Sequence, residues 1–285
     1  MPTCKLCHSP NIDAPIVLRE MMFGTREEFE YFRCQDCDTL QISEIPSDLS
    51  QYYPSDYYSF SPRHPGFKER LKRMVKGPSI PAWAKNISPK SSVLDVGCGS
   101  GALLHDMKEW GFRDLSGYDP FCTPIDTGGV SISNERPNNK TFDIVMMHHA
   151  LEHVPDPAAS LQDARNWLKP DGKLIIRIPV RQGWAWREYG TNWAHLDPPR
   201  HLYHWTVKGF TQFADKQGFK VKGQGFDGTL FSLAYSPMFA ADIPMNSADA
   251  FIPDGLWRRA AELNAAGDGD ASWFVLERCG SSHHL

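Results

Sequence analysis

The stretch VLDVGCGSG, Val93 to Gly101, decides the fold of this chain. Residues with the pattern of a buried strand lead directly into Gly97, Gly99 and Gly101. Glycine lets a backbone turn sharply and approach a ligand closely, and the free amides at a helix start favour an anionic group. The stretch therefore predicts a strand, a ligand-binding loop and a helix that begins near Ala102.

Strand and helix patterns alternate through the rest of the chain. The strand patterns are SVLDVG, LSGYD, FDIVMMH, KLIIRIP, FKVKG and SWFVLER. The helix patterns cover residues 101–110, 157–168 and 206–217. Such alternation predicts an α/β fold, with a mostly parallel sheet covered by helices on both faces.

The glycine spacing alone leaves two ligand classes open. The letters GCGSGA also satisfy the G-x-G-x-x-A pattern of dinucleotide-binding proteins. Asp119 closes LSGYD, 18 residues beyond Gly101. It does not separate the classes, because an acid at this place can bind ribose hydroxyls in either.

The motifs that follow carry a resemblance to one family. Residues 93–101, Asp119, FDIVMMHHALEHVPDP (142–157) and LKPDGKLIIRIP (168–179) stand in the order and spacing of class I S-adenosylmethionine-dependent methyltransferases. The resemblance covers about residues 90–280. It implies a Rossmann-like sheet of seven strands, mostly parallel, in which SWFVLER is the antiparallel last strand.

The same resemblance implies S-adenosylmethionine as cofactor and assigns the positions around it. The glycine loop, with Cys98 inside it as a small filler, would pass the methionine portion. Asp95 would steady the loop or the cofactor's amino group, and Asp119 would hold the ribose. The other implied cofactor positions are Pro120, Met147 and His148.

The letters HHALEH allow three interpretations. His149, Glu152 and His153 match H-x-x-E-H, the inverted zinc-protease pattern, but Pro155 and Pro157 limit a helix here to about one turn and disfavour a protease. The chain also resembles ubiquinone-biosynthesis O-methyltransferases, which hold a divalent metal with E-x-x-E-H at this place. Here His149 replaces the first acid. In the third interpretation His153 is a hydrogen-bonded structural residue.

Residues 183–205, GWAWREYGTNWAHLDPPRHLYHW, are predicted to form the acceptor side. Aromatic faces stack on sugars or aromatic acceptors, and polar groups fix their hydroxyls. Imidazole titrates near neutral pH and can take a hydroxyl proton, although alignment for in-line methyl transfer does most of the work. The candidate catalytic residues are His149, His153, His195 and His201.

Four cysteines form two Cys-x-x-Cys pairs, separated by 26 residues. The pairs, Cys4 with Cys7 and Cys34 with Cys37, have the spacing of a zinc ribbon, in which four thiolates close a structural site. A redox motif is the alternative. The ribbon together with HLDPPRHLYH resembles zinc-ribbon-bearing methyltransferases of polysaccharide and specialised-metabolite pathways.

The predicted organisation follows from these patterns and from charge. Residues 1–60 hold ten acids and four bases and form the zinc-ribbon-like module. Residues 61–89 form a linker with an amphipathic helix, and residues 61–90 hold eight bases and one acid. The methyltransferase domain covers 90–280, with insertions at 181–205 and 226–270.

Composition limits the function classes. Hydrophobic residues make up 41%, charged residues 22%, and the formal net charge is -4, as in an ordinary globular protein. No apolar run reaches the ~20 residues of a membrane span, and the N-terminus lacks a signal-peptide pattern, so a cytoplasmic location is expected. These features favour a small-molecule or sugar acceptor, most simply methylated at oxygen, and leave the oligomeric state open.

Besides a nicotinamide-dependent dehydrogenase, which the glycine spacing alone also allows, two other functions stay open. An RNA methyltransferase is one, but phosphate recognition needs clustered bases, and the ribbon half is acidic. A non-catalytic interaction protein that keeps the methyltransferase fold is the other.

Overall fold

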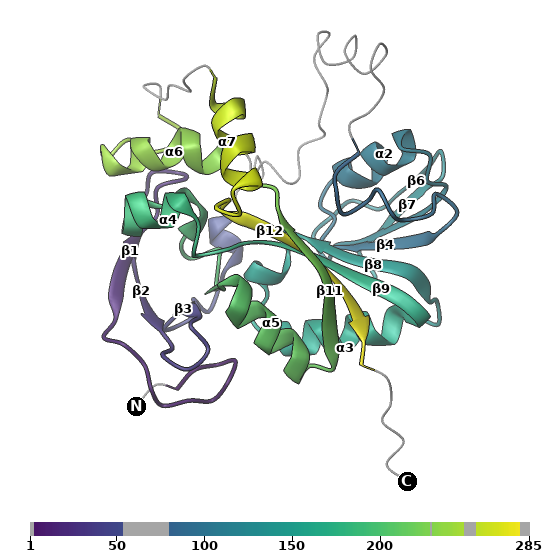
Figure 1. Ribbon diagram of the computed structural model, residues 1–285, viewed down its shortest axis with the longest axis horizontal. Helices are drawn as coiled ribbons and strands as arrows, with labels where there is room; N and C mark the ends of the chain where they lie inside the picture. Colours follow the sequence, from purple (N-terminus) through teal and green to yellow (C-terminus); the bar gives the residue numbers. More distant parts are fainter. Residues whose placement is uncertain (1–2, 54–79, 229, 248–254, 280–285) are drawn as a thin grey trace.

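The computed structural model describes residues 3–53, 80–228, 230–247 and 255–279. These residues form a sheet of eight strands, a sheet of four strands and the helices packed on them (Figure 1). The predicted amphipathic helix and the predicted boundary near residue 60 lie outside the described residues. None of the helices in the described part is long and apolar enough to cross a membrane.

The larger sheet has the strand order β11-β12-β9-β8-β4-β5-β7-β6. The strands β4, β5, β7, β8 and β9 pair in parallel, whereas β12 runs antiparallel to both of its neighbours and β6 runs antiparallel to β7. Their bounds are β4 Ser92–Val96, β5 Asp114–Tyr118, β6 Ile125–Thr127, β7 Val130–Ser133, β8 Phe142–His148, β9 Leu168–Pro179, β11 Phe219–Phe226 and β12 Ala271–Arg278.

The predicted Rossmann-like class and the antiparallel strand SWFVLER are confirmed. The sheet has eight strands among the described residues, whereas the family resemblance implies seven. The six strand patterns found in the sequence omit β6 and β7. Both are too short, at three and four residues, to show a period of their own.

Alternation along the central strands sends side chains to two separate cores. Ile144 and Met146 of β8 pack with Leu104 of α2 on one face, while Val145 and Met147 pack on the other face with α3 and α5. Both faces of these strands are covered, so the side chains on either face are apolar. The sequence of each strand is therefore a continuous apolar run. Figure 1 shows α2 beside β4 to β7, and α3 and α5 beside β9 and β11.

Side-chain caps set where the helices α3 and α5 begin. The Asp156 side chain accepts a hydrogen bond from the Ala159 amide (2.9 Å) at the start of α3, with Pro157 in the first turn. Thr206 caps α5 in the same way. The helices are α2 Ala102–Glu109, α3 Pro157–Trp167, α4 Trp184–Tyr189, α5 Val207–Lys216, α6 Leu230–Ala240 and α7 Leu256–Ala265, with short 3-10 helices η1 Ser50–Tyr52, η3 Leu151–His153, η4 Gly190–Asn192 and η5 Ala194–Leu196.

The smaller sheet joins the cysteine module to the 181–205 segment. Its order is β1-β2-β3-β10, all antiparallel, with β1 Ile16–Arg19, β2 Glu28–Arg33, β3 Leu40–Ile42 and β10 Tyr203–His204. The buried side chains of Leu18, Tyr31 and Leu40 belong to the same core as β8 and β9. The described part of the module therefore packs onto the larger sheet.

Candidate active site

The glycine loop between β4 and α2 has a backbone that only glycine adopts easily. Gly97, Gly99 and Gly101 have φ values of 76°, 52° and 75°. A Cβ on Gly97 would lie 2.6 Å from the Cβ of Ala150, and one on Gly101 would overlap Ile132. The loop thus lies directly against the residue that follows His149.

Asp119, at the end of β5, holds this loop through its carboxylate. Its Oδ2 accepts a hydrogen bond from the Gly99 amide and its Oδ1 one from the Phe121 amide, both at 2.9 Å. The residue is buried, with 8% of its surface exposed. Each carboxylate oxygen has a second lone pair, so Asp119 retains acceptors for ribose hydroxyls.

Asp95 is the best evidence that a ligand belongs here. It lies near the end of β4, is buried, and its Oδ1 has no hydrogen-bond partner among the described residues. Burial, followed by the negative charge of Asp119, raises its pKa well above the usual range. A buried acceptor without a donor is costly, and an ammonium group of a bound ligand would satisfy it.

The other predicted cofactor positions differ in their surroundings. Burial raises the pKa of the Cys98 thiol, which packs against Gly117 of β5, so the thiol stays protonated as a filler would. Met147 is part of the core, and Pro120 is exposed. The Nε2 of His148 lies 3.2 Å from Nη1 of Arg177.

Both ring nitrogens of His149 are occupied by protein groups. Its Nε2 is hydrogen-bonded to Nη1 of Arg177, and its Nδ1 lies 3.1 Å from Oε1 of Glu152. Arginine can only donate, so Nε2 accepts and Nδ1 donates to Glu152. Burial, followed by the charge of Arg177, lowers the pKa of His149 well below its usual value.

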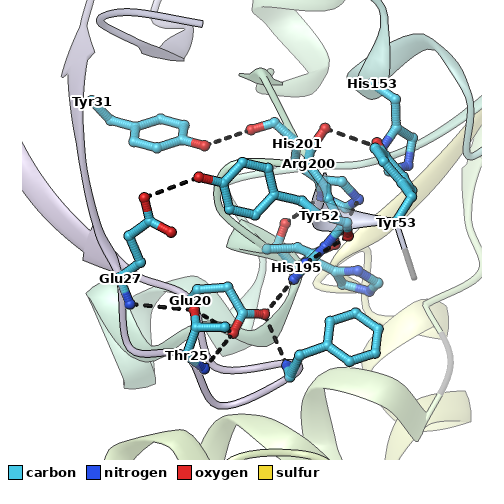
Figure 2. Close-up of polar contacts among 12 residues, drawn as sticks. Glu20, Thr25, Glu27, Tyr31, Tyr52, Tyr53, His153, His195, Arg200 and His201 are labelled. Carbon is cyan, nitrogen blue, oxygen red and sulfur yellow. Dashed lines mark hydrogen bonds and ion pairs between the residues drawn. The ribbon is translucent and has the colours of Figure 1, made fainter. Parts of the chain in front are cut away.

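In His153 and His201, Nδ1 likewise faces an acceptor, here a backbone carbonyl, but no arginine of the described chain is hydrogen-bonded to Nε2. The Nδ1 of His153 lies 3.1 Å from the Arg200 carbonyl, and the Nδ1 of His201 lies 2.7 Å from the His195 carbonyl. Carbonyls only accept, so each Nδ1 is the donor and each neutral ring keeps a lone pair on Nε2. The two rings meet edge to face at 4.6 Å, and the Tyr53 hydroxyl lies 3.0 Å from Nδ1 of His153 (Figure 2).

Carboxylates surround this histidine pair. One ligand atom from each of Glu152, His153 and His201 lies within 4.8 Å of the others. Within the described part of the chain, neither Oε2 of Glu152 nor Oδ2 of Asp197 has a hydrogen-bond partner, and Oδ2 of Asp197 lies 3.9 Å from Nε2 of His201. The cluster therefore gathers hydrogen-bond acceptors. Such an arrangement can take up a proton or bind a cation. His149 is not a member of the three-residue group.

The structure adds charged residues that sequence reasoning missed. Arg177 donates through Nε to Oδ2 of Asp227 at 2.7 Å, and Asp270 lies 3.8 Å from Nε2 of His195. The ring of His195 stacks on that of His149 at 6.1 Å. Arg177 could have been found from the sequence, because it is a charged residue inside the apolar run KLIIRIP. No comparable sequence pattern marks Asp227 or Asp270 as site residues.

The aromatic residues of 183–205 divide into core and half-buried groups. Trp193, Tyr203 and Trp205 are at most 2% exposed and pack in the core, so they offer no face to an acceptor. The half-buried group is Trp184, Trp186 and Tyr189.

The four cysteine sulfurs of the N-terminal module lie together. Cys4 and Cys37 are 3.6 Å apart at Sγ, Cys7 and Cys34 are 3.5 Å apart, and all four sulfurs lie within 4.8 Å of one another. A tetrahedral zinc with Zn–S bonds of about 2.3 Å places its sulfurs about 3.8 Å apart. The geometry fits such an ion.

Curated relatives share part of this chain. A ubiquinone biosynthesis O-methyltransferase of Serratia proteamaculans is 31% identical over 169 residues, which are 54% of this chain and 66% of the relative. One from Colwellia psychrerythraea is 33% identical over 108 residues, 33% of this chain and 44% of the relative. The chain thus matches less than two thirds of the length of either relative.

A solved complex of a Haloferax volcanii methyltransferase with the Trm112 methyltransferase activator aligns at a TM-score of 0.46 and 19% identity, covering 70% of this chain and 86% of that one. A family model described as a methyltransferase domain matches residues 67–223. That range is more than half of the chain. With the glycine loop, Asp119 and the sheet order in place, the chain belongs to the methyltransferase-domain family, among the class I S-adenosylmethionine-dependent methyltransferases.

Proposed function

We propose that this protein transfers a methyl group from S-adenosylmethionine to a hydroxyl of a small-molecule or sugar acceptor. The observation that carries the proposal is the grouping of His153 and His201 with the buried carboxylates of Glu152 and Asp197. The names of the curated relatives support oxygen as the acceptor atom. A polysaccharide or specialised-metabolite pathway stays a prediction from the sequence.

The cofactor side uses the residues of the glycine loop. S-adenosylmethionine supplies a methyl group on a positively charged sulfur. The unpaired Oδ1 of Asp95 would accept from its amino group, and the free lone pairs of Asp119 would accept from its ribose. The contact of Gly97 with Ala150 brings the loop next to the histidines. Cofactor and acceptor would therefore meet at the carboxyl ends of β4 and β8.

On the acceptor side, His201 is the preferred base. Its Nε2 lone pair can take the hydroxyl proton, and Asp197 at 3.9 Å would stabilise the resulting imidazolium. His153 could act as base in the same way. His149 could not, because its Nε2 is already hydrogen-bonded to Arg177. The role of His149 would be to orient Glu152. His195 holds His201 through its carbonyl.

The same cluster supports a second way to activate the hydroxyl. Glu152, His153 and His201 offer the carboxylate and imidazole ligands that divalent transition metals accept. A cation there would lower the pKa of a bound hydroxyl. Methyl transfer assayed with and without added Mn²⁺ separates this route from a metal-free base.

We further propose that the four cysteines hold one structural zinc. With four thiolates no ligand position stays open for a substrate. The ion would stabilise the module whose strand β3 pairs with β10.

Two assays test the proposal. The first is calorimetric titration with S-adenosylhomocysteine, and the second is transfer of a labelled methyl group to a panel of catechols, phenols and sugars. We expect binding by the wild type, at least tenfold weaker binding in Asp119→Ala, and at least a hundredfold loss of transfer in His201→Asn with cofactor affinity retained. The exposed His105→Asn is the matched control. Absence of cofactor binding in the wild type would refute the proposal.

Two outcomes of the same experiments favour the alternatives. Tight, salt-sensitive binding of bulk RNA would point to an RNA methyltransferase. Cofactor binding without transfer to any acceptor of the panel would point to an interaction protein.

A further inference from the structure

The loop between β1 and β2 places one buried carboxylate against Arg200, which also binds the Asp197 carboxylate that faces His201. Glu20 is fully buried. Its Oε1 accepts from the Phe23 amide at 2.8 Å and its Oε2 from the Thr25 amide at 3.0 Å. The Thr25 hydroxyl adds a third bond at 3.2 Å. The backbone of the module's own loop therefore fixes this carboxylate in place.

Arg200 connects that carboxylate to the acceptor segment (Figure 2). Its Nη2 donates to Oε1 of Glu20 at 2.6 Å and to Oδ1 of Asp197 at 2.5 Å, and its Nε donates to the same Oδ1 at 2.9 Å. Arg200 is only 1% exposed, and its guanidinium lies 5.0 Å from the centre of the Phe23 ring. One buried cation is thus shared by two carboxylates.

The way Arg200 holds Asp197 is unusual for the pair. An arginine and a carboxylate prefer a fork in which two N–H groups meet two oxygens. Here both donors reach only Oδ1, and Oδ2 stays without a hydrogen bond, 3.9 Å from Nε2 of His201. Two other acceptors hold the guanidinium in this orientation. Oε1 of Glu20 accepts from Nη2, and the Tyr52 carbonyl accepts from Nη1 at 3.2 Å. Of the two, only Glu20 carries a negative charge.

We propose that Glu20 is a positioning residue for methyl transfer, which acts by keeping Oδ2 of Asp197 free to face His201. The inference rests on the proposed role of His201 as base. Without the negative charge of Glu20, Arg200 turns into the forked geometry and takes Oδ2 away from the histidine. Arg200 also carries the carbonyl that orients His153, so the same shift disturbs both imidazoles.

The test compares Glu20→Gln with Glu28→Gln, a change of the same kind at an exposed position of β2. The acceptors are the catechols, phenols and sugars of the panel, and the readouts are the kcat and KM of transfer and the affinity for S-adenosylhomocysteine. For Glu20→Gln we expect kcat to fall at least tenfold, while acceptor KM and cofactor affinity stay within twofold. Glu28→Gln should behave as the wild type.

A spectroscopic readout makes the test independent of the acceptor. Nitrogen-15 spectra of the imidazole rings at one pH should show the His201 signals displaced in Glu20→Gln and unchanged in Glu28→Gln, with the exposed His105 as internal reference. Unchanged His201 signals together with a wild-type kcat would overturn the proposal. A wild type that does not bind S-adenosylhomocysteine would instead overturn the proposed function.

Arg200→Lys keeps the inference testable if Glu20→Gln does not fold. Lysine retains the charge but lacks the planar set of donors that reaches two carboxylates at once. We expect the same displacement of the His201 signals and a comparable loss of kcat. Wild-type values for both in Arg200→Lys would contradict the role assigned to the Glu20–Arg200 pair.

Discussion

Replacing Gly97 by alanine tests whether the close approach of the glycine loop to the histidine segment is required. At φ 76° an alanine costs roughly 1–2 kcal/mol for the left-handed backbone alone. The new Cβ would lie 2.6 Å from the Cβ of Ala150, well inside contact distance, and relief of such overpacking costs a further ~1–3 kcal/mol. We expect Gly97→Ala to destabilise the protein by about 2–5 kcal/mol.

Gly255→Ala is the matched control, because it separates the two costs. Gly255 has a φ of 80°, and a Cβ there meets nothing within 4 Å. This variant should lose only the backbone part, about 1–2 kcal/mol. Urea denaturation followed by tryptophan fluorescence measures both losses, and calorimetry measures the affinity for S-adenosylhomocysteine.

The affinity for the cofactor product should also differ between the two glycine variants. The loop must shift away from Ala150 to admit a methyl group, so Gly97→Ala should bind S-adenosylhomocysteine at least tenfold more weakly, and Gly255→Ala as the wild type does. Equal losses of stability in the two variants, or unaltered affinity in Gly97→Ala, would refute the argument from close approach.

The remaining predictions concern charge and metal. Arg177→Met removes the partner of the half-buried Asp227 carboxylate and should cost about 1–3 kcal/mol in urea denaturation, whereas Arg187→Met, in an exposed pair, should cost at most about 1 kcal/mol. A hydrogen bond from Lys169, followed by one from the Ser92 amide, lowers the pKa of Asp143 to about 2, so its contribution is present above pH ~4 and is lost as pH falls towards 2. The stability difference between wild type and Asp143→Asn should therefore shrink over that window in acid denaturation. Purified wild type should contain one zinc per chain by atomic absorption, and Cys34→Ser should contain none and melt at lower temperature.

Much of the fold could be predicted because its signals are local. The β4 strand, the glycines after it and the start of α2 depend on neighbouring residues, and the boundaries expected for α3 and α5 agree with the structure within a residue or two. The cysteine pairs are equally local, since each pair lies within one tight turn. The short strands β6 and β7 were missed because β7 is defined by its pairing with β5, and β6 by its pairing with β7, rather than by a pattern of their own.

The candidate site was predictable in its parts but not in its assembly. His149, Glu152 and His153 lie close together in the sequence and were candidates for a shared metal or base site, yet the orientation of His149 is set by Arg177 from the next strand. His201, named only as one of several candidates, comes from a distant segment to join Glu152 and His153.

The sequence by itself determined that a strand would lead through a glycine loop into a helix, because glycine dihedral freedom and side-chain periodicity are properties of short stretches. Only the tertiary structure decided which imidazoles keep a free lone pair. That outcome depends on which carbonyl, arginine or carboxylate from elsewhere in the chain faces each ring nitrogen. Glu20 shows the same rule most clearly, since nothing near it in the sequence indicates that it holds Arg200 in place.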